Sequence, residues 1–135
     1  MGLTGTFEGW VPTATDIYLR GYSSVSFSKY STYEYPLFES GQITLGSSTS
    51  AIMAFLNLTG FTRVNFEIYK TATYSGRAIA VQIAGDPTRW AKTKLTSTLN
   101  TVEVISVELG SIAVNSQFSF EFIDWRGVIY HIWLS

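Results

Sequence analysis

Alternation of apolar and polar residues with a period of two recurs along this chain, and it constrains the fold more than any other feature. Side chains of a β-strand point alternately to its two faces, so this pattern predicts strands that bury one face. A helical period is almost absent. The clearest inward-facing sets are Val64, Phe66, Ile68, Ile79, Val81, Ile83, Phe118, Phe120 and Phe122. The chain is therefore expected to be all-β.

Clusters of Gly, Ser, Asn and Pro separate these segments, which is typical of a β-sandwich or barrel. We expect an antiparallel β-sandwich of the jelly-roll type with about nine strands and little helix, as a single domain over residues 1–135. The expected strand spans are 5–10, 16–22, 25–30, 42–45, 51–56, 63–70, 78–84, 101–109, 118–123 and 128–134, the first being the weakest. The segments 28–40 and 85–96 are expected to be loops, the latter with room for one helical turn.

Two of the expected strands depart from simple alternation. In 101–109 the pattern changes phase between Val104 and Ile105, which predicts a β-bulge at that point. In 128–134 both faces are apolar apart from His131, so this strand is either central and covered on both sides or part of a subunit contact. His131, the only histidine, is expected to be a hydrogen-bonded structural residue.

Composition excludes several classes of function. The net charge is −1 and only 14% of residues are charged, which argues against electrostatic binding of nucleic acid or of an anionic membrane. Cysteine is absent, so disulfides and thiolate metal sites are excluded, and no cofactor or metal is expected. The longest apolar stretches are too short for a transmembrane helix, so no membrane insertion is expected.

From residue 58 onward, the order of the expected elements resembles the second half of a galactose-binding-like jelly roll, the fold of many carbohydrate-binding modules. The segments that carry the resemblance are 58–68, Gly76, 78–83, 101–109, the turn 110–116, 118–122 and 128–134. The resemblance implies sugar binding. The family often ends in an acidic pair that helps hold calcium, whereas this chain has Tyr130-His131 in the closing strand, so calcium is not expected.

The neutral, Ser-, Thr- and Tyr-rich composition is also similar to that of receptor-binding and baseplate domains of phage tails. That similarity implies a place outside the cell or on the virion surface. It also implies a glycan or cell-surface polysaccharide as partner, and a homo-oligomer or larger assembly as context.

Sugar binding needs a flat aromatic face beside planar polar groups. Two segments offer that mixture. The residues of the first are Asp86, Arg89 and Trp90, joined by Tyr74 and Arg77 from the preceding turn, and those of the second are Asp124, Trp125 and Arg126. The alternative is that Trp90 and Trp125 each cover one end of the core.

Four aromatic residues are expected at subunit contacts instead. Tyr33 and Tyr35 fall on the same side of an extended segment, and amphipathic rings suit interfaces as well as glycan platforms. Tyr130 and Trp133 belong to the apolar last strand.

Three hypotheses follow for the function. The first is a non-catalytic carbohydrate-binding or adhesion module, with weak single sites strengthened by several copies. The second is a structural or assembly domain of an oligomeric particle such as a phage tail. The third is a small glycoside hydrolase, which needs two facing carboxyl groups that Glu67, Glu103 and Glu121 could supply from neighbouring strands.

Overall fold

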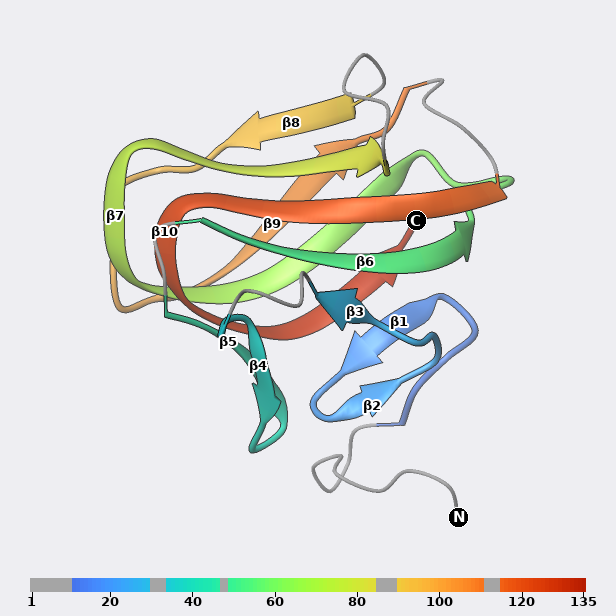
Figure 1. Ribbon diagram of the computed structural model, residues 1–135, viewed down its shortest axis with the longest axis horizontal. Helices are drawn as coiled ribbons and strands as arrows, with labels where there is room; N and C mark the ends of the chain where they lie inside the picture. The colour runs from blue at the N-terminus through green and yellow to red at the C-terminus, as the bar shows by residue number, and fades with distance from the viewer. Residues whose placement is uncertain (1–10, 30–33, 47–48, 85–89, 111–114) are drawn as a thin grey trace.

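The computed structural model describes residues 11–29, 34–46, 49–84, 90–110 and 115–135, which form ten strands and no helix (Figure 1). No segment in these ranges is a helix that could span a membrane. The strands are β1 Asp16–Leu19, β2 Tyr22–Ser23, β3 Ser28–Lys29, β4 Leu37–Glu39, β5 Gln42–Leu45, β6 Thr49–Asn57, β7 Arg63–Ile83, β8 Trp90–Lys94, β9 Val102–Glu108 and β10 Asn115–Leu134. The all-β prediction is confirmed, whereas the jelly-roll connectivity stays a prediction.

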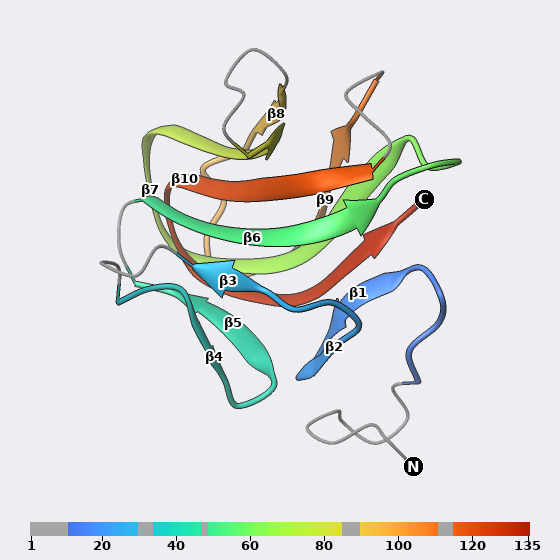
Figure 2. The same cartoon turned by 45° about the vertical axis from the view of Figure 1, so that its right-hand side comes forward.

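Two long strands, β7 and β10, run antiparallel to each other and bend together (Figures 1 and 2). Their pairing shifts register between Ile123 and Trp125 and again between Arg126 and Gly127. Asp124 has a φ of 55° there, a left-handed conformation that turns the chain. A Cβ at Gly127 would collide with the backbone oxygen of Tyr69, so the bend needs glycine at this position. What the sequence indicated as four strands is therefore two.

Because β7 and β10 bend, each contributes to two layers of one curled sheet. In the first layer β9 pairs with residues 63–69 of β7, and residues 64–70 of β7 pair with 127–134 of β10. β1 and β5 share the far edge of β10. In the second layer the order is β8, residues 78–83 of β7, residues 115–123 of β10, β6 and β3. The two layers face each other as in a sandwich.

The core lies between the layers and contains eight of the nine predicted inward-facing residues, while Ile83 is partly buried and packs against it. The first layer contributes Phe66 and the second contributes Phe120 and Phe122, all fully buried. The Phe66 ring meets the other two edge-on, with centroids 5.8 Å and 6.0 Å away. Burial of each such ring contributes roughly 1.5–3 kcal/mol, so this cluster is a principal source of stability.

The predicted bulge in 101–109 is wrong. β9 pairs with β7 in continuous register from Val102 to Glu108. The phase change has another cause: Glu103 occupies an inward position opposite Ile68, where it meets the fully buried Lys70. Val102 and Val104 consequently lie on the outer face and are exposed.

The segment expected to be a loop at 85–96 contains a strand over its second part. β8 pairs with β7 from Gln82↔Trp90 to Ala78↔Lys94, and Ala91 packs against the core. The segment 28–40 likewise begins with β3 and ends with β4. The expected strand 5–10, with Trp10, lies outside the described residues.

The last strand is central, because it pairs with β7 on one edge and with β1 and β5 on the other. His131 Nε2 lies 2.5 Å from Asp16 Oδ1, and its ring stacks on Trp133 with centroids 4.2 Å apart. His131 is thus a hydrogen-bonded structural residue, as predicted.

Candidate functional site

Two tight hairpins form on the open side of the first layer, and their turns have the same design. In the first, Leu19 pairs with Tyr22 across Arg20-Gly21, which have φ of 42° and 103°. In the second, Glu39 pairs with Gln42 across Ser40-Gly41, with φ of 53° and 74°. Positive φ at both central residues marks a type I′ turn, whose twist matches that of the flanking strands. Glycine as the second turn residue makes this conformation accessible.

The tips of the hairpins face each other because β1 and β5 pair with successive parts of the same β10 edge. Ile43 of β5 lies opposite Ile129, and Leu19 of β1 lies opposite His131. Between them the Arg20 backbone N–H donates a hydrogen bond to the carbonyl oxygen of Tyr130, at 2.9 Å. Figure 2 shows the two hairpins converging below the long strands. The space between them is a hollow lined by residues of both hairpins.

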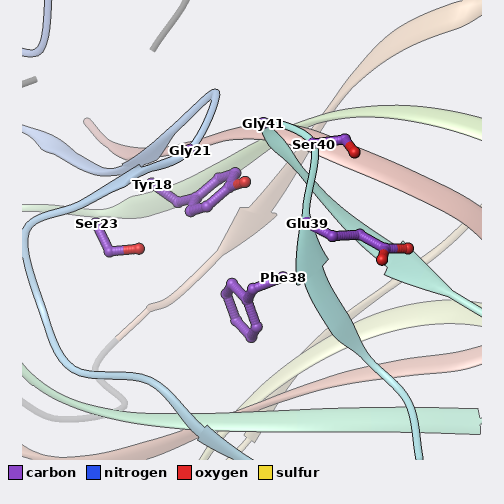
Figure 3. A pocket seen from close by; sticks show the side chains of 7 residues that line it. All are labelled: Tyr18, Gly21, Ser23, Phe38, Glu39, Ser40 and Gly41. Atoms are coloured by element: carbon purple, nitrogen blue, oxygen red, sulfur yellow. The ribbon is translucent and has the colours of Figure 1, made fainter. Parts of the chain in front are cut away.

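That hollow, the hairpin pocket, has a volume of about 270 Å³ and is shown in Figure 3. It is lined by Tyr18, Gly21, Ser23, Phe38, Glu39, Ser40 and Gly41. A second hollow of about 270 Å³ adjoins it, because Ser23 and Phe38 line both, and Val25 and Phe27 extend the wall. The pocket therefore continues as a groove from the hairpin tips toward β3.

Aromatic rings form the apolar wall of the hairpin pocket. Phe38 is 42% exposed and stacks on Phe27 with centroids 5.5 Å apart at 26°. Its ring also meets Tyr18 edge-on at 6.0 Å. These contacts hold the Phe38 ring in a defined orientation while leaving part of it open to solvent.

The polar groups of the pocket are mostly neutral. Burial raises the pKa of Tyr18 to about 12, partly offset by a backbone hydrogen bond from Gly21, so the phenol keeps its proton at physiological pH. The Ser23 hydroxyl points into the space between Tyr18 and Phe38, whereas the Glu39 side chain extends away from both rings (Figure 3). The pocket thus combines an exposed ring with uncharged hydroxyl groups.

Four of the predicted sugar-binding residues gather at the bend of β7 and β10, although the sequence placed them in two segments. The Arg126 guanidinium lies 5.8 Å from the Tyr74 ring centroid. Arg77 donates from Nε to Leu95 O at 2.9 Å and from Nη1 to Tyr74 O at 3.5 Å. The Asp124 carboxylate lies directly against Gly76. Two Arg77 nitrogens therefore donate to backbone oxygens, and we interpret this cluster as stabilising the bend.

The two tryptophans of the predicted sugar sites have opposite environments. Trp125 is fully buried, donates from Nε1 to Ala78 O at 3.2 Å and meets Phe122 edge-on, so its proposed role in sugar stacking is wrong. It covers the core, the alternative left open by the sequence. Trp90 is 47% exposed at the start of β8. Asp86 and Arg89 lie outside the described residues.

The predicted interface residues make contacts within the chain. The half-buried Tyr35 packs its ring against Gly46, and Arg20 lies over the Tyr130 ring at 4.7 Å. Trp133 is half-buried beside His131. Tyr33 lies outside the described residues. A role for these residues between subunits stays a prediction.

The carboxylates considered for glycoside hydrolysis lie on different faces. Glu67 is on the outer face of the first layer and pairs with Arg20 at 2.9 Å. Glu103 points between the layers, and Glu121 belongs to the outer face of the second layer. These three residues therefore form no facing pair. Within the described ranges, no three or more His, Asp or Glu side chains gather in a group that could hold a metal.

Sequence reasoning missed Tyr18, Ser23 and Phe38, because the pocket is created by hairpins rather than by a motif. The available signal was the dipeptides Arg20-Gly21 and Ser40-Gly41, each between short apolar-polar alternations. Comparison of the chain with models of protein families, with curated proteins and with solved structures finds no match. The functional conclusion therefore rests on the geometry of the chain itself.

Proposed function

We propose that this chain is a non-catalytic carbohydrate-binding module that holds a terminal sugar residue of a glycan in the hairpin pocket. The observation that carries the proposal is the exposed face of Phe38 beside the neutral hydroxyls of Tyr18 and Ser23. A sugar ring has an apolar C–H face that packs on an aromatic ring and hydroxyls that need donors and acceptors at its edge.

The size of the pocket supports a small ligand. Each hollow, at about 270 Å³, falls just below the roughly 300–1,000 Å³ of sites for drug-sized molecules. One sugar ring would occupy the hollow at the hairpin tips, and the next residue would extend over Phe27. A contact this small gives weak binding per site, so strength would come from several copies displayed together on a cell or virion surface.

The test is a glycan array with the purified chain and two matched variants. Phe38→Ala removes the exposed ring of the pocket, and Tyr74→Ala removes a ring of nearly equal exposure, 43% against 42%, from the bend of β7 and β10. We expect Phe38→Ala to lose at least tenfold in affinity for any bound glycan. Tyr74→Ala should bind as the unchanged chain does.

The outcomes separate the sites. Loss of glycan binding in Tyr74→Ala but not in Phe38→Ala would transfer the site to the bend, where Arg126 and Asp124 would be its polar groups. Binding unaffected by either variant would overturn the hairpin pocket as a glycan site. Circular dichroism of each variant confirms that any loss comes from a folded chain.

A second candidate function, assembly into a particle, is favoured by one specific observation. Val102 and Val104 are 52% and 58% exposed on β9, whose only pairing partner within the described ranges is β7. Thr93 Oγ1 of β8 donates to Ser106 O of β9 at 3.2 Å, but β9 and β8 form no strand pairing in the described ranges. An edge strand with exposed β-branched residues is a template for pairing with another chain. The mass in solution tests it: a stable oligomer that binds no glycan supports assembly, and a glycan-binding monomer opposes it.

A further inference from the structure

The outer face of the second layer carries an arrangement that the hairpin pocket does not use. Register places Met53 of β6, Ser119 of β10, Gln82 of β7 and Trp90 of β8 in one row across four strands. Their neighbours in sequence point inward to the core, as Phe118 and Phe120 show, so this row faces outward. We name this face the strand platform.

Exposed aromatic residues stand at both sides of the strand platform. Trp90 on β8 is 47% exposed, and Phe55 on β6, one outward position beyond Met53, is 60% exposed. Neighbouring strands are 4.7–4.9 Å apart, so the three intervals from β6 to β8 span about 14 Å. That distance suits an extended ligand lying across the strands better than a single small ring.

Between the two aromatic residues lie Gln82, Ser119 and Met53 in the row itself, and Gln117 opposite Phe55. In the next outward row, on the side away from Phe55, Ala51 and Ala80 flank Glu121 and are buried at 4% and 0% exposure. Ser119 is 1% exposed, and its Oγ has no hydrogen-bond partner among the residues that the structure describes. A buried hydroxyl without a partner is costly, which makes Ser119 a residue whose placement a ligand would explain.

The remaining polar groups of the platform can form hydrogen bonds with the hydroxyl groups of a ligand. Glu121 and the Gln82 amide flank Ser119 on the same face, and Lys92 lies 5.1 Å from the Trp90 ring centroid. Lys92 and Glu121 lie on either side of Ala80, so the positive charge of one offsets the negative charge of the other. The platform therefore favours neutral, hydroxyl-rich chains over strongly charged ones.

We propose that the strand platform binds an extended neutral polysaccharide across β6, β10, β7 and β8, with Trp90 and Phe55 stacking on sugar rings at its two ends. Ser119 Oγ would complete its hydrogen bonding to a ligand hydroxyl once the half-buried Gln82 and Met53 side chains move aside. The inference shares with the proposed function that the chain binds carbohydrate, but it concerns a separate site and a polymer rather than a terminal residue.

The experiment is affinity electrophoresis through gels that contain a soluble glucan, xylan, mannan or galactan, with polygalacturonate as the acidic comparison. The variants are Trp90→Ala and Phe55→Ala for the platform, Phe38→Ala for the hairpin pocket and Tyr74→Ala as an exposed-ring control. We expect one neutral polymer to retard the unchanged chain. Trp90→Ala and Phe55→Ala should each weaken retardation at least fivefold, with no effect of Phe38→Ala or Tyr74→Ala.

Ser119→Ala supplies a readout that a purely structural role would not give. It removes a buried hydroxyl that has no partner among the described residues, so the free energy of unfolding should stay equal or rise. Polymer binding should nevertheless fall two- to fivefold. A stability gain combined with a binding loss identifies a group retained for the ligand.

The outcomes for the two sites are independent. Loss of polymer binding in Phe38→Ala alone would overturn the platform and leave the hairpin pocket as the polymer site. Retardation by no neutral polymer, or by polygalacturonate only, would also overturn the platform, while glycan-array binding that depends on Phe38 would still stand.

Discussion

The long-strand body and the hairpin side of this chain differ in strand length and in how deeply they bury their phenylalanine residues. The body, formed by β6, β7 and β10, buries Phe118, Phe120 and Phe122 completely. The hairpin side has strands of two to four residues and leaves Phe38 42% exposed. The same residue type thus serves as core in one region and as a surface ring in the other. The contrast means that the buried core and the exposed ring of the proposed glycan site can be tested by separate substitutions.

The largest expected effect comes from a matched pair of phenylalanine truncations. Phe120→Ala leaves a cavity against Phe66 and should cost about 3–5 kcal/mol of the free energy of unfolding. Phe38→Ala removes a ring that is already partly in water, so its cost should stay below about 1.5 kcal/mol. Urea denaturation measures both. Equal losses would show that the hairpins are as integral to the core as the long strands are.

The second expected effect compares two ion pairs that join the same strands, β7 and β9. Lys70 is fully buried; its Nζ donates to Thr96 O at 2.6 Å and Oγ1 at 3.2 Å, and lies 3.1 Å from Glu103 Oε1 as an ion pair without a hydrogen bond. Arg63 pairs with Glu108 at 2.6 Å, but these side chains are 52% and 65% exposed. Only the first pair contains a fully buried charged group, the Lys70 ammonium.

Lys70→Met keeps the length of the side chain but leaves Glu103 and the Thr96 carbonyl without a cation. The expected loss is about 2–3 kcal/mol, below the 3–5 kcal/mol of a fully buried pair because the Glu103 side chain is 19% exposed. Arg63→Met, the control, should cost at most about 1 kcal/mol. Thermal and urea unfolding of both variants measure the two losses in the free energy of unfolding. A smaller loss for Lys70→Met than for Arg63→Met would contradict the role assigned to burial.

How far the fold could be predicted depends on whether its signal is local. Alternation identified the inward residues of β7 and β10, because it reflects a strand with one buried face. It could not reveal that the four predicted segments join into two long bent strands. The bend depends on the close approach of Gly127 to the Tyr69 backbone, which is a contact between residues far apart in the sequence. Lys70 falls on the same face of the alternating pattern as Val64, Phe66 and Ile68, so the sequence alone could have predicted that this lysine is buried. Its partner Glu103 was not, because pairing between β7 and β9 is non-local.

The candidate site was less predictable than the fold. Trp125 was predicted to bind sugar, yet it is buried. The prediction failed because the sequence pattern of a tryptophan between Asp and Arg is the same at the end of a core and at a sugar site. Tyr18 and Phe38 come from hairpins separated in sequence, and only their pairing with one edge of β10 joins them. A pocket made by tertiary pairing leaves no motif in the sequence.

The smallest expected effect tests whether Tyr18, a pocket-lining residue that is only 2% exposed, is as sheltered from water as the core is. Its pKa is raised from 10 to about 12 by burial, so the folded chain holds this proton more tightly than the unfolded chain. Stability from this group is therefore complete below pH 10 and is lost as the pH rises from 10 to 12. One unit above the ordinary tyrosine pKa, the loss should be about 1.4 kcal/mol.

The measurement is the free energy of unfolding as a function of pH for the unchanged chain and for Tyr18→Phe, with tyrosinate absorbance followed in parallel. The other tyrosines contribute to both curves, so the difference between the curves isolates Tyr18. We expect Tyr18→Phe to lose less stability than the unchanged chain between pH 10 and 12. Parallel curves would mean that water reaches the Tyr18 hydroxyl as freely in the folded chain as in the unfolded one. The hairpin pocket would then be a loosely closed site, and its rigid aromatic wall would consist of Phe27 and Phe38 alone.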